Sequence, residues 1–382
     1  MSPTPTVPSK DHAPRRAHRA TAEELEKVTE LKGEGRRVLV TGASGMLGAA
    51  VARLLRDRGW TVRLMQRSAA PLAAEEGFEQ VLGSVSDPEA VGKALDRVDD
   101  IVHLAAKVSF AGEWEEFVRT NVTGTRVILE SARLAGVRNV VFVSSPSVAH
   151  QGSSIQGDGA EPADPHGARG NYARSKAAAE LLALEADSPG LKVTAIRPHI
   201  VWGPGDTQLV ERIVDRAARG RLPILDDGAA LIDTTYIDNA AEAIVRALER
   251  IDVSHGEAFV VTNGQPRPVG EIIALMCKAG SVAPPTRKVP SGVAKLAGRA
   301  IEKVWAVKPG KDEPPMTEFL AEQLSTAHWF DQKRTHEVLG WKPAVTIEEG
   351  MDRLKSYYTR NPLPVVAEVR QKRLEKVRRK VS

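Results

Sequence analysis

Cysteine is almost missing from this chain of 382 residues, because Cys277 is the single one. One thiol cannot form a disulfide within the chain, and its scarcity fits a reducing compartment. No apolar run approaches the ~18 residues of a membrane span, and the first residues are polar and proline-rich, unlike a signal peptide. We therefore predict a cytoplasmic protein in which Cys277 is a small, buried core residue.

The excess of positive charge, +4 in total, lies at the two ends of the chain. Residues 1–20 carry a net +3 and residues 361–382 a net +5, so the residues between them carry −4. A nucleic-acid enzyme usually has its basic face on the folded domain, so we predict no nucleic-acid partner. Residues 1–35 are expected to form a disordered or partly helical tail. Residues 359–382 form a basic tail, which contacts an anionic membrane or a pathway enzyme or remains a solvated helix.

Short apolar segments alternate with helical patterns from position 36 onward. Such alternation predicts an α/β fold, a Rossmann-type doubly wound parallel sheet with helices on both faces. The predicted strands are 38–40, 61–65, 101–104, 140–143 and 193–196.

The first predicted strand runs into a glycine-rich turn with glycines at 42, 45 and 48, and a helix pattern follows. In a strand–turn–helix unit, Gly42 permits the tight turn, Gly45 lets the backbone approach a pyrophosphate, and Gly48 lets the helix pack closely. The free N–H groups of the helix N-terminus then face the phosphates. The alternative is a tight turn without a ligand. The predicted dinucleotide contacts here are Gly42, Ser44, Gly45, Met46, Leu47 and Gly48.

The end of the second predicted strand bears on the choice of cofactor. An acidic residue there would bind the ribose hydroxyls of NAD, but the sequence has Gln66-Arg67-Ser68. Arg67 and Ser68 could hold a 2′-phosphate through charge-assisted hydrogen bonds. We therefore predict NADP(H) rather than NAD(H), with a solvated surface charge as the alternative role of Arg67.

Tyr172 and Lys176 share one face of a predicted helix, because they are four positions apart. A nearby ammonium favours the phenolate and lowers the pKa of a phenol, which can then exchange a proton with a substrate oxygen. Ser145, at the end of the preceding strand, is the predicted hydrogen-bond donor to that oxygen, ahead of Ser144 and Ser147. We predict Ser145, Tyr172 and Lys176 as the catalytic residues, against the alternative of a helix surface and a strand-end turn.

Together these segments resemble the extended short-chain dehydrogenases/reductases, in particular the 3β-hydroxysteroid dehydrogenase-like branch, from about position 36 to position 358. The resemblance implies that Ala105, Ala106 and Pro198 also contact the cofactor, and that Tyr172 and Lys176 do so at the nicotinamide end. Within the branch, the chain resembles the 2-alkyl-3-oxoalkanoate reductases of bacterial long-chain olefin biosynthesis. The segments that carry this likeness are 203–210, 233–240 and 313–324.

The resemblance implies an NADPH-dependent reductase that converts a lipid-like 2-alkyl-3-oxoalkanoate to its 3-hydroxy acid, and a chain that forms homo-oligomers. Two alternatives remain open. One is a 3β-hydroxysteroid or sterol dehydrogenase that uses NAD(P), and the other is a dinucleotide-sensing protein without catalysis.

Proline and glycine become more frequent after position 198. We expect 199–231 and 264–322 to form a smaller, mostly helical substrate-binding lobe over the carboxyl ends of the strands. Residues 36–198 would form the NAD(P)-binding domain, to which 232–263 and 323–358 return.

Within that lobe, apolar residues at 293, 296, 297, 300, 301, 304 and 305 predict an amphipathic helix. This helix either packs on the domain or covers a lipid-like substrate or a membrane surface. His103, His150, His199 and His328 lack metal-ligand spacing, so we predict no metal site.

Overall fold

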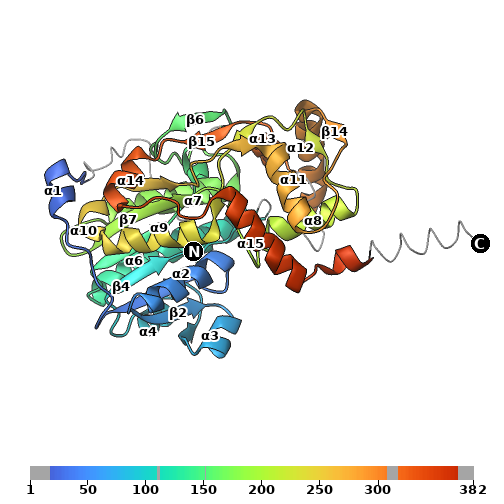
Figure 1. Ribbon diagram of the computed structural model, residues 1–382. Coiled ribbons are helices and arrows are strands. Elements are labelled where there is room, and N and C mark those ends of the chain that lie inside the picture. Colours follow the sequence, from blue (N-terminus) through green and yellow to red (C-terminus); the bar gives the residue numbers. More distant parts are fainter. Residues whose placement is uncertain (1–17, 110–111, 151, 308–316, 369–382) are drawn as a thin grey trace, which may run out of the picture.

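A seven-stranded parallel sheet forms the centre of the computed structural model, which describes residues 18–109, 112–150, 152–307 and 317–368 (Figure 1). Its strands follow the order β12-β7-β5-β4-β1-β2-β3. Their bounds are β1 Arg37–Thr41, β2 Thr61–Gln66, β3 Glu79–Leu82, β4 Asp100–His103, β5 Asn139–Val143, β7 Lys192–Pro198 and β12 Ala258–Val261.

The strand order reverses beside β1, and this position is where ligands bind in such sheets. The chain runs from β1 to β2 and β3 on one side, and then crosses to β4 on the other side of β1. Thr41 and His103, at the carboxyl ends of β1 and β4, are partners in the ladder. A crevice at this switch point is the expected ligand site of a doubly wound sheet.

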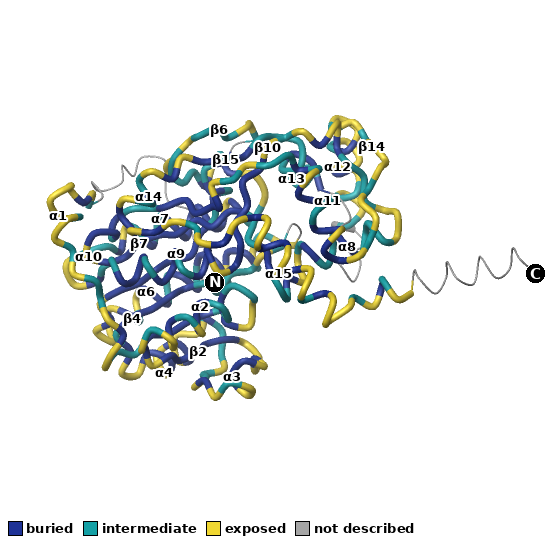
Figure 2. The backbone as a smooth tube through the Cα atoms, viewed as in Figure 1, coloured by how far each residue is buried: buried dark blue, intermediate teal, exposed yellow. Residues whose placement is uncertain are grey.

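Helices cover both faces of the sheet, because each strand is apolar on both sides. On one face, Val38 and Val40 pack with α2 and α9, and on the other, Leu39 and Ile101 pack with α4, α6 and α7. Figure 2 shows the strands as a buried layer between these helices. The predicted doubly wound α/β fold is confirmed. The helices are α2 Met46–Asp57, α4 Pro88–Ala94, α6 Gly124–Leu134, α7 Gly170–Glu185, α9 Ile237–Glu249 and α14 Lys333–Leu339.

A third core lies beyond the carboxyl edge of the sheet. Val214, Met276 and Leu354, from α8, α11 and α15, pack there with Trp202 and Tyr236. The helices of this region are α8 Val210–Ala218, α11 Val269–Ala279, α12 Ser291–Val307, α13 Glu318–Gln323 and α15 Ile347–Arg360. Cys277 is fully buried in this core, as predicted, and burial raises the pKa of its thiol to about 11.

Three small sheets lie outside the seven-stranded sheet. A four-stranded sheet has the order β13-β10-β15-β6, and β8 pairs with β11, as β9 does with β14. Their bounds are β6 Ile155–Asp158, β8 Val201–Trp202, β9 Ile224–Leu225, β10 Leu231–Ile232, β11 Thr235–Tyr236, β13 Arg267–Pro268, β14 Lys288–Val289 and β15 His328–Phe330. The remaining short elements are α1 Ala22–Lys27, α3 Pro71–Glu76, α5 Trp114–Phe117, the π-helix η1 Val118–Thr123, the 3₁₀-helix η2 Pro146–Ala149 and α10 Ile251–Ser254.

The helix predicted around 293–305 is present as α12, but most of its apolar face is not buried. Val293, Leu296 and Val304 are 56%, 66% and 63% exposed. The helix packs on α13 through small residues instead: a Cβ on Gly298 would lie 2.6 Å from the backbone of Thr317 and Glu318.

No helix in the described ranges is long and apolar enough to cross a membrane. Residues 1–17 and 369–382, on which part of the predictions for the two tails falls, lie outside the described residues.

Candidate active site

The glycine-rich turn lies at the switch point and has the geometry of a backbone cradle. Gly42 has a φ of +78°, and a Cβ there would lie 2.8 Å from the amide nitrogen of Ala105. A Cβ on Gly48 would lie 2.4 Å from the Gly42 carbonyl oxygen. Both positions therefore require glycine, one for the turn and one for the close approach of α2.

The N-terminus of α2 is left open toward solvent at this turn. Gly45 is the N-cap, so no side chain caps the helix, and the first turn contains no acidic residue. Ser44 and Gly45 are exposed, while Met46 and Leu47 are half-buried. The first N–H groups of the helix thus lack side-chain partners and present partial positive charge, which suits a phosphate.

The ends of β2 and β4 form the flanks of this cradle. Arg67 and Ser68 follow β2 and are exposed, and Ala105 and Ala106 follow β4 and are half-buried. The buried Oε1 of Gln66, the last residue of β2, has no hydrogen-bond partner. An acceptor left unpaired in this place fits a hydroxyl of a bound ribose.

Ser145 and Tyr172 contact each other across the ends of β5 and α7. Ser145 caps η2 through a hydrogen bond from the Ser147 amide, and its hydroxyl also bonds to the Tyr172 phenol. Both residues are only partly buried. The structure therefore brings together two of the three predicted catalytic side chains at a surface that a substrate can reach.

Lys176 lies one turn further along α7 and is almost completely buried. Its ammonium donates to the Val143 carbonyl at 2.6 Å and lies 4.0 Å from the centre of the Phe142 ring. Burial lowers the pKa of Lys176 to about 7, and Glu180 opposes that change. Glu180 in turn forms a buried ion pair with Arg197 of β7, which fixes α7 against the sheet.

The pKa of Tyr172 differs from the sequence-based expectation. Burial raises it to about 12, and the hydrogen bond from Ser145 is the opposing influence. The predicted lowering by Lys176 is not seen, because the ammonium is bonded to the Val143 carbonyl and is itself desolvated. At neutral pH the phenol is accordingly protonated.

Asn121 is a site residue that the sequence analysis did not identify. Its side chain accepts from the Lys107 amide at 2.7 Å and donates to the Ser175 hydroxyl at 2.9 Å. It thereby joins the loop after β4 to the helix that carries Tyr172 and Lys176. Asn121 lies in the π-helix η1, and such irregular turns often occur at functional sites. The Asn121-Val122-Thr123-Gly124 segment is visible in the sequence, but its geometry is not.

His103 has a structural role at the end of β4. Its Nδ1 lies 2.7 Å from the Thr41 hydroxyl, and that hydroxyl also accepts from the Ala105 amide at 3.1 Å. Burial lowers the pKa of His103 to about 3. This bond ties β1 to β4 directly behind the glycine-rich turn.

Two hollows on the surface lie away from these residues. One is lined by Tyr236, Arg353 and Tyr357, and the other by Trp329 and Gln332 among others. Neither is lined by a predicted site residue. Within the described ranges, no group of His, Cys, Asp or Glu side chains is arranged to hold a metal ion.

Comparison with protein families matches residues 38–262 to the NAD dependent epimerase/dehydratase family. The chain belongs to this family. The match spans the glycine-rich turn, the Ser145–Tyr172–Lys176 set and the seventh strand of the sheet. The predicted resemblance to extended short-chain dehydrogenases/reductases is thereby confirmed.

Relatives within the epimerase/dehydratase family define the type of reaction. The 2-alkyl-3-oxoalkanoate reductase of Stenotrophomonas maltophilia is 37% identical over 326 residues, which cover 84% of this chain and 98% of that protein. The 3-beta-hydroxysteroid dehydrogenase of Mycolicibacterium neoaurum is 29% identical, over 85% of this chain and 91% of that protein. The protein is therefore an oxidoreductase that acts on a hydroxyl/ketone pair.

A solved structure of a similar fold, MoeE5 in complex with UDP-glucose and NAD, superposes with a TM-score of 0.65 at 22% identity. The superposition covers 86% of this chain and 99% of the MoeE5 chain. The residues present here fit a nicotinamide dinucleotide, as the family requires: the turn needs glycine at 42 and 48, the helix N-terminus is uncapped, and Gln66 has an unpaired acceptor.

Proposed function

We propose that this oxidoreductase uses NADPH to reduce the ketone of a long-chain 2-alkyl-3-oxoalkanoate to the 3-hydroxy acid, as a step of long-chain olefin biosynthesis. The observation that carries the proposal is the hydrogen-bonded Ser145–Tyr172 pair, with Lys176 one helical turn away. This pair occurs in a chain with 37% identity to a reductase of that substrate class. Bound cofactor would supply the hydride, and the residues of the chain handle the proton.

The protonated state of Tyr172 meets a requirement of the reductive step. A ketone that gains a hydride becomes an alkoxide and needs a proton, whereas the oxidation of an alcohol needs a base. With its pKa raised to about 12, Tyr172 is protonated at neutral pH and is still a much stronger acid than an alcohol. Tyr172 therefore donates the proton, and Ser145 orients the substrate oxygen by a second hydrogen bond.

Lys176 and the end of β2 serve the cofactor in this proposal. The Lys176 ammonium binds the hydroxyls of the nicotinamide ribose. Arg67 and Ser68 hold the 2′-phosphate of NADPH. Both residues are exposed, and the Gln66-Arg67-Ser68 segment contains no carboxylate that would repel a phosphate. Ala105 and Ala106 lie along the cofactor between these two ends, and Pro198 contacts its nicotinamide end.

The second candidate is a 3β-hydroxysteroid or sterol dehydrogenase that uses NAD(P). The 29% identity to a 3-beta-hydroxysteroid dehydrogenase favours it. One feature opposes its use of NAD: no carboxylate stands at the end of β2, where one would select that cofactor.

A spectrophotometric assay of NADPH oxidation separates the two candidates. We expect the purified protein to oxidise NADPH with a long-chain 2-alkyl-3-oxo acid and to be much slower with a 3-ketosteroid or with NADH. A preference for the steroid, or for NADH, would contradict the proposal.

The exposed face of α12 supports a further part of the proposal, a peripheral contact with an anionic membrane surface. Val293, Leu296 and Val304 form an apolar strip, and Lys303 and Arg299 beside it are also exposed. An exposed apolar strip flanked by cations is typical of helices that lie in a membrane interface. Such a surface would place the enzyme next to a lipid-like substrate, and a homo-oligomer would bring several such strips to one membrane.

A further inference from the structure

Three buried imidazoles meet at the end of η2, the short turn that Ser145 begins, and the proposed mechanism does not use them. His150, His199 and His328 are 2%, 7% and 1% exposed. The rings of His150 and His328 are 4.9 Å apart and those of His199 and His328 are 5.8 Å apart, both edge to face. They come from three separate segments, the end of η2, the end of β7 and the start of β15.

The hydrogen-bond partners of His199 and His328 determine which ring nitrogen of each carries the proton. The Nδ1 of His199 lies 2.6 Å from the Asp233 carbonyl oxygen, which can only accept, so Nδ1 carries the proton. Thr326 donates its single hydroxyl proton to the Glu322 carbonyl, so it accepts from Nε2 of His328 at 3.0 Å. The Nδ1 of His328 is therefore a bare acceptor, and it has no partner.

His150 is the least satisfied of the three residues. Neither of its ring nitrogens has a hydrogen-bond partner, although both are buried. A neutral imidazole always has one N–H group, so a buried donor is left unpaired in this structure. Such a group destabilises the fold, and its presence in a folded protein calls for a ligand or a functional reason.

The location of the cluster ties it to the substrate side of the site. His150 lies at the end of the turn that Ser145 begins, and Ser145, Ser147 and Ala149 on that turn are only partly buried. His199 follows Pro198, on the strand adjacent to β5. Arg169, three residues before Tyr172, is close enough to act on the His150 ring electrostatically, and it is paired with Glu322 at 2.8 Å.

We propose that His150, with His328 and His199 behind it, binds the carboxylate of the 3-oxo acid while Ser145 and Tyr172 hold its ketone oxygen. This inference rests on the proposed function. In a 3-oxo acid only one carbon separates the ketone carbon from the carboxyl carbon, so the two groups must be recognised by neighbouring side chains. A buried N–H donor without a partner, next to a ketone site, suits an anionic acceptor.

The protonation states of the three histidines fit a site whose unpaired N–H group finds an acceptor only when the acid is bound. Burial lowers the pKa of His199 to about 4 and that of His328 to about 3, and it also lowers the pKa of His150. All three rings are thus neutral at neutral pH in the ligand-free protein. A carboxylate beside them supplies the missing acceptor and favours the imidazolium form.

Binding rather than turnover tests this inference most directly. The probes are a 2-alkyl-3-hydroxyalkanoic acid with short alkyl chains and its methyl ester, titrated calorimetrically into protein loaded with oxidised cofactor. We expect the wild type to bind the acid about 10- to 100-fold more tightly than the ester. His150→Phe should bring the ratio of the two affinities close to one, whereas His166→Gln, on an exposed residue of the following loop, should leave it unchanged.

The outcomes separate this inference from the proposed function. Equal affinities for acid and ester in the wild type, or an unchanged ratio in His150→Phe, would overturn the carboxylate site. If His150→Phe does not fold, His150→Gln replaces it with the same expected loss of preference. A wild type that prefers the acid over the ester, but does not oxidise NADPH with the corresponding 3-oxo acid, would retain the carboxylate site and refute the proposed reductase.

Discussion

Lys176 illustrates how burial sets the chemistry of one residue at this site. Its side chain is 3% exposed and rests on the Phe142 ring, so the ammonium has lost nearly all of its hydration. A single carbonyl and the more distant Glu180 compensate only in part, and the pKa of Lys176 falls to about 7. A residue that must be charged to bind a ribose therefore titrates close to neutral pH.

This titration predicts a pH dependence of cofactor binding. The charged form is present below about pH 7 and is lost above it, so we expect the affinity for NADPH to weaken several-fold between about pH 7 and pH 9. Fluorescence titration of NADPH across this range is the measurement. Lys176→Met has no titratable amine and should bind more weakly with a flat profile. Parallel profiles for wild type and variant would contradict this role of Lys176.

Arg67 is the residue on which the choice between the two cofactors depends. It is exposed at the end of β2, where a carboxylate would select NAD. We expect Arg67→Ala to raise the KM for NADPH by about 10- to 100-fold, because a charge-assisted contact with the 2′-phosphate is lost, and to change the KM for NADH little. Arg97→Ala, on another exposed arginine, is the matched control. An equal effect on both cofactors would assign Arg67 to the surface.

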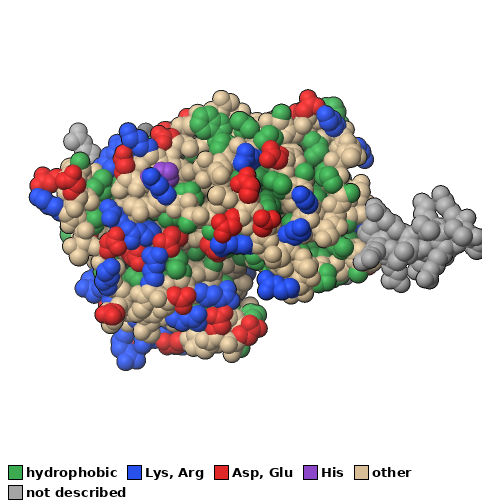
Figure 3. All heavy atoms as spheres, viewed as in Figure 1, with side chains coloured by type: hydrophobic (Ala, Val, Ile, Leu, Met, Phe, Trp, Pro, Cys, Tyr) green, Lys and Arg blue, Asp and Glu red, His purple; other side chains and the backbone are tan. Residues whose placement is uncertain are grey.

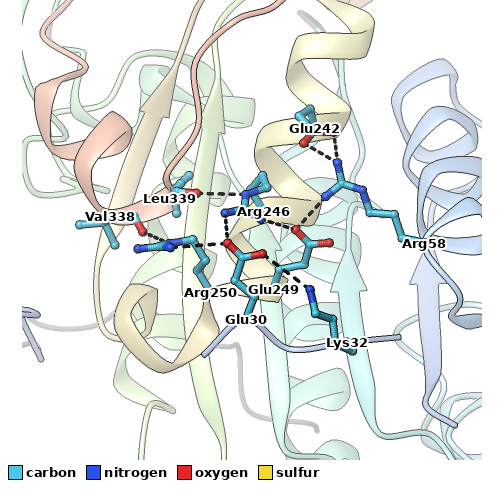
Figure 4. A network of polar contacts seen from close by, with 9 residues as sticks. All are labelled: Glu30, Lys32, Arg58, Glu242, Arg246, Glu249, Arg250, Val338 and Leu339. Atoms are coloured by element: carbon cyan, nitrogen blue, oxygen red, sulfur yellow. Dashed lines mark hydrogen bonds and ion pairs between the residues drawn. The ribbon is translucent and has the colours of Figure 1, made fainter. Parts of the chain in front are cut away.

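At the scale of elements, an ion-pair network joins the N-terminal segment, α2, α9 and the end of α14 (Figure 4). Arg246 of α9 donates to Glu30 at 2.6 Å, to Glu249 at 2.8 Å and to the Leu339 carbonyl at 3.2 Å. Arg58 completes it with a bond to Glu249 at 2.7 Å. Arg246 lowers the pKa of Glu30 to about 2. These contacts join segments that are about 200 positions apart in the chain.

Removal of the Arg246 guanidinium should measurably lower the free energy of unfolding. Arg246→Met leaves the Glu249 and Glu30 carboxylates and the Leu339 carbonyl without their shared partner, so we expect a loss of about 1–3 kcal/mol in the free energy of unfolding. Arg219→Ala removes an exposed pair with Asp215 and should cost about 0–1 kcal/mol. Urea denaturation of both variants makes the comparison, and equal losses would refute the importance of the network.

The sequence predicts the central elements well and the peripheral ones poorly, for physical reasons. Strands buried on both faces are continuous apolar runs, so β1, β4 and β5 are recognisable, and glycine spacing marks the turn before α2. The four-stranded sheet is built from segments of two to four residues that lie far apart in the chain, and such lengths carry no periodicity.

The sequence likewise predicts some features of the candidate site and misses others. Residue types at fixed spacing identify Ser145, Tyr172 and Lys176, because the chemistry needs those groups. The pKa of Tyr172 and the contacts of Asn121 depend on burial and on a π-helical turn, which no local pattern encodes. The His150 cluster is assembled from three distant segments and could be found only in three dimensions.

At the scale of the whole molecule, two features favour contact with an anionic membrane surface. They are the positive charge at the ends of the chain and the exposed strip on α12. The residues between the basic ends carry a net negative charge, so attraction to an anionic surface must be local. Figure 3 shows hydrophobic side chains, with Lys and Arg among them, on the surface in the region where α11 to α13 lie in Figure 1.

Vesicle binding tests this surface. We expect the protein to sediment with phosphatidylglycerol vesicles and not with phosphatidylcholine vesicles, because both cations and apolar side chains contribute. Leu296→Glu/Val304→Glu should lower the bound fraction several-fold, and Leu134→Glu, on a residue that is 91% exposed on α6, should not. Loss of a dimer on size-exclusion chromatography, with vesicle binding unchanged, would assign the strip to contact between copies of the chain.

The central claim is that Tyr172 delivers the proton to the ketone while the rest of the site holds cofactor and substrate. The most direct measurement is single-turnover oxidation of bound NADPH by a 2-alkyl-3-oxo acid in the wild type and in Tyr172→Phe, with the NADPH dissociation constant determined for both. We predict an unchanged dissociation constant and a rate reduced by about 100- to 10,000-fold in Tyr172→Phe. A rate within a few-fold of the wild type, with cofactor bound normally, would contradict the account.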